Sequence, residues 1–595
     1  MGELHGERIR LLQERLAGDG FDYYIVWNAD PYLNEYIDDH YKYRDYLSGF
    51  TGSNGTLLVG RKESILWTDG RYYIQAEKEL KGSGVELYKM QEKDVPSLTE
   101  YLAAHAAGGR VGMDGSLISR AEYEELTEAC PDTVFDLSAD YAGKLWEGRP
   151  AETARPIRLL PKSIAGKTVG EKLKEVIKGL CKQGADILML SDMSDIMWLF
   201  NIRGDDIRYS PLARSYAFVS RQKTLLFVDG CCAGSEIYAA MQTYGVTVRP
   251  LMDIYSGINM PKDCVLACDK NRTNARLFAL RAKGNSVLPV NNHDLIRKAV
   301  KNRTEIKNAR KFHLLDGAAI TEWIFTVKKK MEAGENLREY EAAKLAENIK
   351  SGRKGYLGES FETICAFREN GAIVHYKPAE KGSKKLAPEG FLLLDCGAQY
   401  YGATTDMTRT IALGPLTAEM KEDYTAVLKG HLQLMRLVFL KGSHGENLDL
   451  AAREPIWERF IDYRHGTGHG VGSFLCVHEG PQSIRFQIRE NAVTPALEEG
   501  MILSDEPGIY RKGKYGIRIE NLLLCVQKRK NEWGTFLGFE PLTFIPYERE
   551  AILRERLTAP EKETLNLYHR AVYEALKEEV SPEAEKWLRE VCAEI

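Results

Sequence analysis

The chain has 595 residues, of which 44% are hydrophobic and 28% are charged, so it can form several globular domains with ordinary cores. Its 81 basic and 85 acidic residues are well mixed and give a net charge of -4, which offers no electrostatic case for nucleic-acid binding. No apolar run approaches the length of a membrane span, and no polybasic amphipathic stretch indicates binding to a membrane surface.

The N-terminal segment MGELHGERIRLLQERL is charged from its third residue and predicts an amphipathic helix, not a signal peptide. The 11 cysteines are scattered and lack the paired CxxC motifs of metal sites, although Cys231 and Cys232 are adjacent. We interpret the cysteines as reduced, buried thiols and expect a cytoplasmic protein.

The first half of the chain contains a weak duplication. In each copy, apolar residues at helical spacing precede a short apolar strand, YYIV in the first and ILML in the second. A later strand of each copy ends in Asp-Gly, at Asp69 and Asp229, which we interpret as carboxylates that cap a turn. The alternation of helix and strand predicts an α/β domain for each copy.

The pattern changes near Asn302, where helical segments are followed by strand-rich, glycine-punctuated sequence and then by a helical C-terminus. This order predicts an α+β domain. The predicted domains are residues 1–160 and 161–303 (α/β), 304–547 (α+β) and 548–595 (a helical extension packed on the third domain).

Two aspartates lie in FLLLDCGAQYYGATTDMTRTIAL, which predicts two strands joined by a turn. Asp395 ends the first strand and Asp406 lies in or near the second. A carboxylate after a buried apolar run is costly unless it is paired or bound to a metal. Taken alone, however, the two aspartates are weak evidence and are better explained as turn or cap residues.

Three of the 12 histidines, His465, His469 and His478, lie in HGTGHGVGSFLCVHEGP. The alternating glycines make a helix implausible, so we interpret the segment as extended backbone that a substrate can approach closely. Such a cluster of histidines indicates function rather than packing.

Two glutamates complete the candidate set. Glu506 follows the short apolar strand of MILSDEPGIY, and Glu520 is predicted inside the strand of YGIRIENLLLCV, with Arg518 on the same face. For this last segment, a surface Arg–Glu pair is an open alternative.

Four carboxylates with one imidazole form a hard, oxygen-rich ligand set that suits Mn²⁺ or a similar divalent ion, with Zn²⁺ or Co²⁺ as alternatives. Four carboxylates around one ion would carry excess negative charge. Two ions that share bridging carboxylates resolve this, as in two-metal hydrolases.

The motifs DCGAQYYGATTD, HGTGHGVG, SDEPG and GIRIEN, in this order, resemble the creatinase/aminopeptidase superfamily. Its catalytic domain has the pita-bread α+β fold shared with methionine aminopeptidases and prolidases. More narrowly, YLSGFTGSNGT, WLFNIRGDDI, NGAIVHYKP and FEPLTFIP resemble the three-domain, cytosolic aminopeptidase P family. The resemblance covers essentially the whole chain and implies two creatinase-like α/β domains followed by the pita-bread domain.

The resemblance also implies roles for particular residues. The implied substrate-binding residues are His375, His465, His478 and Arg518, and the implied catalytic residues are His375, His478 and Glu506. The implied metal ligands are Asp395, Asp406, His469, Glu506 and Glu520, of which Asp406 and Glu520 bridge the two ions.

The implied reaction is removal of the residue before a penultimate proline, with a hydroxide between the two metals attacking the first carbonyl carbon. Glu506 would relay the proton, and His375 and His478 would stabilise the intermediate. A homodimer is implied by the resemblance alone. The open alternatives are an Xaa-Pro dipeptidase (prolidase) and a metal-free pita-bread binding module. Arg368 and Glu369 depart from the family pattern before NGA, which predicts an altered pocket rim.

Overall fold

In the computed structural model, which describes residues 2–256, 263–487 and 494–595, the chain divides into two units. The first unit comprises Met1–Pro161 and Lys167–Arg297, and the second comprises Lys162–Gly166 and Lys298–Ile595. None of the helices in the described residues is long and apolar enough to cross a membrane.

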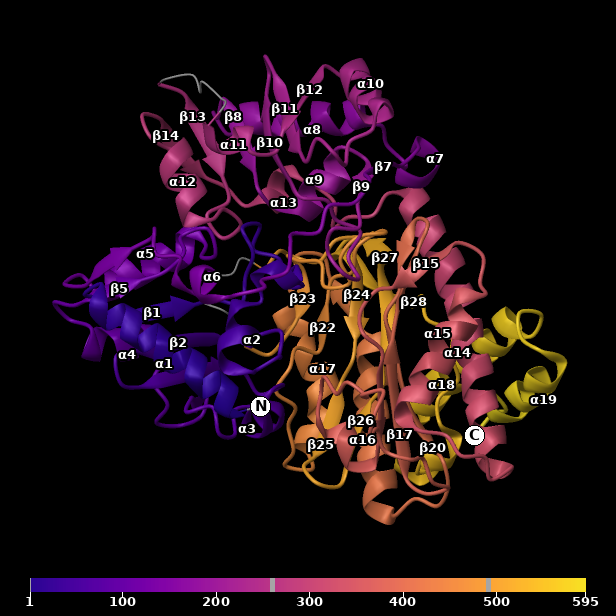
Figure 1. The fold of residues 1–595 in the computed structure, drawn as a ribbon. Helices are drawn as coiled ribbons and strands as arrows, with labels where there is room; N and C mark the ends of the chain where they lie inside the picture. Colours follow the sequence, from indigo (N-terminus) through magenta and orange to yellow (C-terminus); the bar gives the residue numbers. More distant parts are fainter. Residues whose placement is uncertain (1, 257–262, 488–493) are drawn as a thin grey trace. The chain divides into compact units, whose positions relative to one another are not determined.

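The first unit contains two six-stranded sheets with the same strand layout, drawn in indigo to magenta in Figure 1. In each, the central strand pairs antiparallel with one neighbour and parallel with the other. The first sheet has the order β4-β3-β2-β1-β5-β6: Glu86–Lys89, Ser64–Thr68, Thr56–Gly60, Tyr23–Val26, Arg110–Gly112 and Val134–Asp136. The second has the order β12-β11-β10-β8-β13-β14: Val246–Pro250, Thr224–Val228, Ser215–Ser220, Ile187–Leu190, Val265–Cys268 and Ser286–Pro289.

The helix that opens each copy packs through the apolar residues that the sequence marks. Helix α1 (Gly2–Gly18) buries Ile9, Leu12 and Leu16, and α8 (Val169–Lys182) buries residues at the same helical spacing. The matching sheets and helices confirm the predicted duplication and the α/β class of both copies.

The second unit is an α+β domain, as predicted, and every strand pair among its described residues is antiparallel. Its main helices are α14 (Arg303–Glu332), α15 (Glu339–Ser351), α16 (Ala418–Met435), α17 (Gly445–Trp457), α18 (Ala559–Leu576) and α19 (Pro582–Val591). Its strands are β15 (Tyr356–Glu359), β16 (Ile364–Phe367), β17 (Phe391–Cys396), β18 (Ala398–Tyr400), β19 (Ala403–Thr404), β20 (Met407–Ala412), β21 (Val438–Leu440), β22 (Gly468–His469), β23 (Ser483–Ile484), β24 (Ile502–Asp505), β25 (Gly508–Arg511), β26 (Tyr515–Arg518), β27 (Asn521–Asn531) and β28 (Gly534–Pro541).

Two apolar cores hold these strands in place. One packs α14 and α15 against β16, β17 and β20 through residues such as Trp323 and Leu392. The other packs α16, α17 and α18 against β24 to β28 through residues such as Tyr424 and Leu523. Helices α18 and α19 lie beside α14 (Figure 1). The strand ends between the two cores are therefore supported by helices on both sides.

Candidate metal centre

The five predicted ligands all lie at strand ends of the second unit. Asp395 is the penultimate residue of β17, Asp406 directly precedes β20, His469 ends β22, and Glu506 directly follows β24. The prediction for Glu520 was wrong in one respect, because Glu520 lies between β26 and β27 and not inside a strand. Its backbone N–H donates to the carbonyl oxygen of Thr408, 3.1 Å away, which ties it to β20.

The structure brings these side chains together. Possible ligand atoms lie within 4.8 Å of one another in three overlapping groups: Asp395, Asp406 and Glu520; His469, Glu506 and Glu520; and Asp406, His469 and His478. The Nε2 atom of His469 lies 3.4 Å from Asp406 Oδ2 and 3.3 Å from Glu506 Oε1. Asp406, His469 and Glu520 each belong to two groups, and of these three only the carboxylates have two oxygens that could each ligate an ion.

The buried environment opposes the charged state of these carboxylates. Asp406 is 4% exposed and Glu520 is 1% exposed. Burial, followed by the charge of neighbouring carboxylates, raises the pKa of Glu520 well above its usual range. Burial also raises the pKa of Asp395, and it raises that of Glu506 to about 7. Burial opposes protonation of His469, but its hydrogen bond to Asp406 and the charge of Glu506 raise the pKa of its imidazole to about 9.

Two carboxylate oxygens at the centre suit a cation. Asp395 Oδ1 and Glu520 Oε1 are buried and have no hydrogen-bond partner among the described residues. A buried carboxylate oxygen without a partner is costly, and a divalent cation would both ligate it and stabilise its charge. The donor set of hard oxygens and one imidazole is also the type that divalent ions such as Mn²⁺ accept.

Arg518 fixes the second oxygen of Asp395. Its Nε and Nη2 atoms both donate to Asp395 Oδ2, the former over 3.1 Å. Its Nη1 atom donates to the hydroxyl of Tyr510 over 2.8 Å. Arg518 is 2% exposed, so the alternative of a surface Arg518–Glu520 pair is wrong. Glu520 is held instead by Thr408, whose hydroxyl donates to Oε2 over 2.8 Å.

The three other predicted histidines, His375, His465 and His478, differ in how they contact this cluster. The ring of His478 lies 4.4 Å from that of His469, nearly perpendicular to it. His465 contacts the hydroxyl of Tyr510 through Nε2 over 2.8 Å and so connects to Arg518 indirectly. His375 follows Val374, whose carbonyl oxygen accepts a hydrogen bond from Arg518 Nη2 over 3.4 Å. Only His478 belongs to one of the ligand groups found among the described residues.

Tyr510 is a residue of this centre that the sequence did not single out. It bridges His465 and Arg518 through one hydroxyl, and burial raises the pKa of that hydroxyl to about 12, so it remains protonated. The sequence signal that could have identified Tyr510 was the period-two alternation of a strand. Tyr510 lies two residues after Gly508 in β25, the strand that follows Glu506, so the two residues share one face.

Gly468 in β22 and Gly470 just after it pack closely against neighbouring backbone, and the expected close approach of a substrate to this segment stays a prediction. A β-carbon on Gly468 would clash with the carbonyl oxygen of Ser504 on β24. One on Gly470 would clash with the carbonyl oxygen of Glu479. The neighbouring backbone therefore requires glycine at both positions, and this close approach brings His469 beside Glu506.

Arg368 and Glu369 belong to one series of surface ion pairs, with 3.9 Å between Arg368 Nε and Glu369 Oε2. Arg368 Nη1 donates to Glu389 Oε1 over 2.6 Å, and Glu369 pairs with Lys384. Neither contact involves a predicted ligand, and their effect on the pocket rim stays a prediction.

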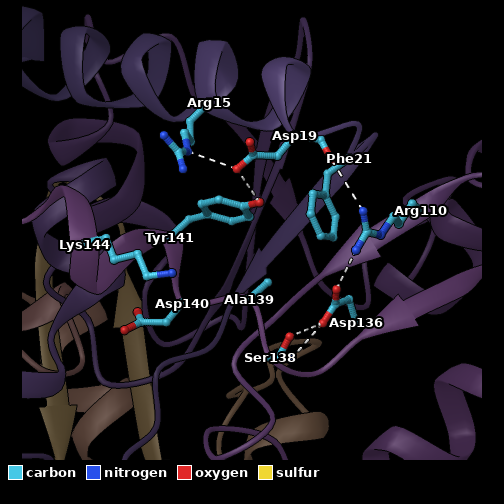
Figure 2. Close-up of a pocket in the computed structure, with 10 residues that line it drawn as sticks. All are labelled: Arg15, Asp19, Phe21, Arg110, Asp136, Ser138, Ala139, Asp140, Tyr141 and Lys144. Carbon is cyan, nitrogen blue, oxygen red and sulfur yellow. Dashed lines mark hydrogen bonds and ion pairs between the residues drawn. The ribbon is translucent and has the colours of Figure 1, made fainter.

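A surface hollow of about 280 Å³ in the first α/β domain contains none of the predicted site residues (Figure 2). Its lining carries three basic and three acidic side chains, and Arg15 pairs with Asp19 while Arg110 pairs with Asp136. The balanced charges do not select a ligand of either sign.

Models of known families match successive parts of the chain. The creatinase/prolidase N-terminal domain matches residues 8–143 and 148–305, metallopeptidase family M24 matches residues 307–527, and the C-terminal region of peptidase M24 matches residues 535–595.

Individual proteins are similar over the whole length. A probable Xaa-Pro aminopeptidase P from Colletotrichum graminicola is 37% identical and is covered over 96% of both chains. The crystal structure of an X-prolyl aminopeptidase from Caenorhabditis elegans, described as a cytosolic enzyme with a di-nuclear active site, has a TM-score of 0.93 and 31% identity over 100% of both chains. A prolidase from Pyrococcus horikoshii, with a TM-score of 0.50 and 25% identity, covers 64% of this chain. These likenesses confirm the predicted fold of two creatinase-like domains followed by a pita-bread domain.

Proposed function

Since this chain belongs to the aminopeptidase P family, within metallopeptidase family M24, we propose that it hydrolyses the peptide bond between an N-terminal residue and a penultimate proline. The observation that carries the proposal is the extent of the likeness. It includes both N-terminal α/β domains as well as the catalytic domain, whereas the prolidase covers only part of the chain.

The enzyme uses two divalent metal ions, for which the donors Asp395, Asp406, His469, Glu506 and Glu520 are the proposed ligands. The clustering of these atoms and the unpaired oxygens of Asp395 and Glu520 support this assignment. We propose that Asp406 and Glu520 would hold both ions, because each belongs to two donor groups and has two carboxylate oxygens. Mn²⁺ is the proposed physiological ion because the donors are mostly carboxylates, and Zn²⁺ or Co²⁺ would occupy the same set.

The two ions supply, when bound, a water of lowered pKa and an electrophile for the scissile carbonyl group. Glu506 then acts as general base, taking a proton from the attacking water and passing it to the proline nitrogen as the C–N bond breaks. This transfer is required because the nitrogen leaves readily only as a neutral amine, and an unprotonated amide anion is a very poor leaving group. His375 and His478 donate hydrogen bonds to the developing oxyanion and to the departing group.

The remaining polar side chains position these groups. Arg518 holds Asp395 and Tyr510, and Tyr510 in turn holds His465, a proposed substrate-binding residue. We propose that the protein is a cytoplasmic homodimer, in keeping with the resemblance to the cytosolic family members. Size-exclusion chromatography with light scattering would measure the mass of the assembly.

The test of the function is to strip the protein of metal, reconstitute it with Mn²⁺ and compare its hydrolysis of three peptides. An Xaa-Pro-Yaa tripeptide such as Arg-Pro-Pro should lose its first residue, and the matching Xaa-Ala-Yaa peptide should not be cleaved. Cleavage of Xaa-Pro dipeptides alone would identify a prolidase. Equal turnover before and after metal removal would contradict a metal-dependent mechanism.

A further inference from the structure

A second cluster of possible metal donors lies in the second α/β domain, in a turn that follows β11. The turn spans residues 229–232 and is closed by a hydrogen bond from the N–H of Cys232 to the carbonyl oxygen of Asp229 over 3.0 Å. It places one carboxylate and two thiols on the same side, and their donor atoms all lie within 4.8 Å of one another. Cys231 is exposed and Cys232 is buried, so the cluster can be reached from solvent through Cys231.

The sulfur atoms are spaced as a tetrahedral ion requires. A metal with bonds of about 2.3 Å to two thiolates at a tetrahedral angle holds the sulfurs about 3.8 Å apart. The Sγ atoms of Cys231 and Cys232 lie 3.7 Å apart. The Sγ atom of Cys231 also lies 3.1 Å from Asp229 Oδ1, so the carboxylate is a third donor on the same side.

Asp229 is already oriented by a buried arginine. Arg214 donates through Nη2 to Asp229 Oδ2 over 2.9 Å, which leaves Oδ1 directed at Cys231. The Arg214 side chain is 7% exposed and is held in turn by Glu152 over 2.5 Å. Metal-binding carboxylates commonly have such a partner on their second oxygen, and the guanidinium also offsets the negative charge of two thiolates and a carboxylate.

We propose that Asp229, Cys231 and Cys232 form a binding site for a thiophilic divalent cation of the zinc class, separate from the two ions of the peptidase centre. Binding breaks two S–H bonds, releases two protons to solvent and forms two metal–sulfur bonds, with no transfer of electrons. Asp229 supplies the third ligand, and water fills the fourth position on the exposed side of Cys231.

A cation must displace the proton that burial holds on the Cys232 thiol. Burial, together with the hydrogen bond to Cys231, raises the pKa of the Cys232 thiol to about 12. Without a cation, Cys232 is therefore protonated and a poor nucleophile. Because the cation must displace this proton, its apparent affinity should increase as the pH rises.

The experiment uses the full-length, Mn²⁺-loaded enzyme and Cd²⁺ as the probe, under anaerobic conditions after reduction and desalting. Cd²⁺ bound to thiolates gives an ultraviolet sulfur-to-metal charge-transfer band, whereas a site of carboxylates and imidazole does not. We expect this band to saturate at one equivalent. Cys231→Ser and Cys232→Ser should each abolish the band, and Asp229→Asn should weaken the apparent affinity.

Cys181→Ser is the matched control, since Cys181 is an exposed cysteine elsewhere in the same unit, and it should leave the band unchanged. Circular dichroism and peptidase activity would establish that the cysteine variants are folded. No band in the parent protein, or an equal band in Cys231→Ser, would overturn the proposal. Formation of a disulfide between Cys231 and Cys232 after reduction, detected by mass spectrometry as a loss of two hydrogens, would also overturn the proposal. Such a pair would be a redox couple and not a cation site.

Discussion

Asp395 shows how the centre divides one carboxylate between two tasks. Its Oδ2 atom accepts two hydrogen bonds from Arg518, while its Oδ1 atom has no hydrogen-bond partner among the described residues. Glu520 is divided in the same way, with Thr408 on one oxygen and no such partner on the other. In each case the protein orients the carboxylate with one oxygen and presents the other, which is the arrangement that a ligand of a metal requires.

Removal of the imidazole should eliminate metal binding at one position. We expect His469→Ala to reduce kcat/KM by more than the ~100-fold that loss of an outer-sphere partner costs, because a direct ligand is lost. Metal content after dialysis and kcat/KM on an Xaa-Pro-Yaa peptide measure both effects. His105→Ala, at an exposed histidine, is the control. A folded His469→Ala enzyme with near-parental activity after metal stripping would refute the ligand assignment.

Arg518 should act through position and not through charge alone. The substitution Arg518→Lys keeps the positive charge. The lysine cannot, however, donate to Asp395 and Tyr510 simultaneously in the planar geometry of the guanidinium group. We expect metal affinity, measured by chelator competition, to decrease about 10- to 100-fold. Arg511→Lys is the matched control, because Arg511 makes a similar two-atom contact with Asp423. Equal affinities in the two variants would show that the Arg518 fork does not position Asp395.

At the scale of elements, the short strand β22 joins two halves of the site. Its Gly468 lets the backbone approach β24, the strand that directly precedes Glu506. A side chain at Gly468 would have to displace the backbone of Ser504, two residues before Glu506.

Because of this close approach, we expect alanine substitutions at Gly468 and Gly466 to have different effects on stability and metal affinity. Gly468→Ala should reduce both metal affinity and the midpoint of thermal unfolding, because β22 must move away from β24. Gly466→Ala should be tolerated, since its β-carbon would meet its nearest neighbour at 3.4 Å. Differential scanning fluorimetry and chelator competition measure the pair, and similar behaviour of the two variants would contradict this account.

The strand ends themselves were largely predictable, because apolar runs such as FLLL mark buried strands and polar residues mark where they end. The break between β26 and β27 was not. Alternation continues through Arg518, Ile519 and Glu520, so periodicity does not reveal that strand pairing changes there. The pairing of Glu520 with Thr408 on β20 depends on contacts between distant parts of the chain.

At the scale of the whole molecule, the C-terminal helices belong to the catalytic unit. Tyr568 on α18 donates to the carbonyl oxygen of Ile545 over 3.0 Å, and His569 Nε2 accepts from the N–H of Tyr547 over 3.2 Å. The boundary near residue 547 stays a prediction, but α18 packs in the same apolar core as β24 to β28.

Burial of His569 should make stability sensitive to acid. Burial, and then the charges of Arg409 and Arg549, lowers the pKa of its imidazole from 6.5 to about 3. The unfolded chain therefore binds a proton below about pH 6.5, whereas the folded chain does so only near pH 3, so stability falls as the pH drops between these values. The contribution amounts to about 2 kcal/mol between pH 8 and pH 5.

His569→Gln tests this, because an amide oxygen can accept the same N–H without titrating. We expect the loss of unfolding free energy between pH 8 and pH 5, measured by urea denaturation, to be smaller by about 2 kcal/mol in this variant. His105→Gln, at an exposed histidine, should leave the pH dependence unchanged. An identical pH dependence in His569→Gln and the parent would contradict the acid-sensitivity account.

The sequence by itself determined the duplicated α/β half, the α+β class of the second half, the family and the set of candidate ligands. Local periodicity and short ordered motifs carry this information, because strands, turns and family signatures are encoded by near neighbours in the chain. Only the tertiary structure decided that Arg518 pairs with Asp395, that Tyr510 connects to His465, and that Gly468 packs against the backbone of β24. These contacts join segments far apart in sequence, and their partners are selected by packing of the two apolar cores and not by any local pattern.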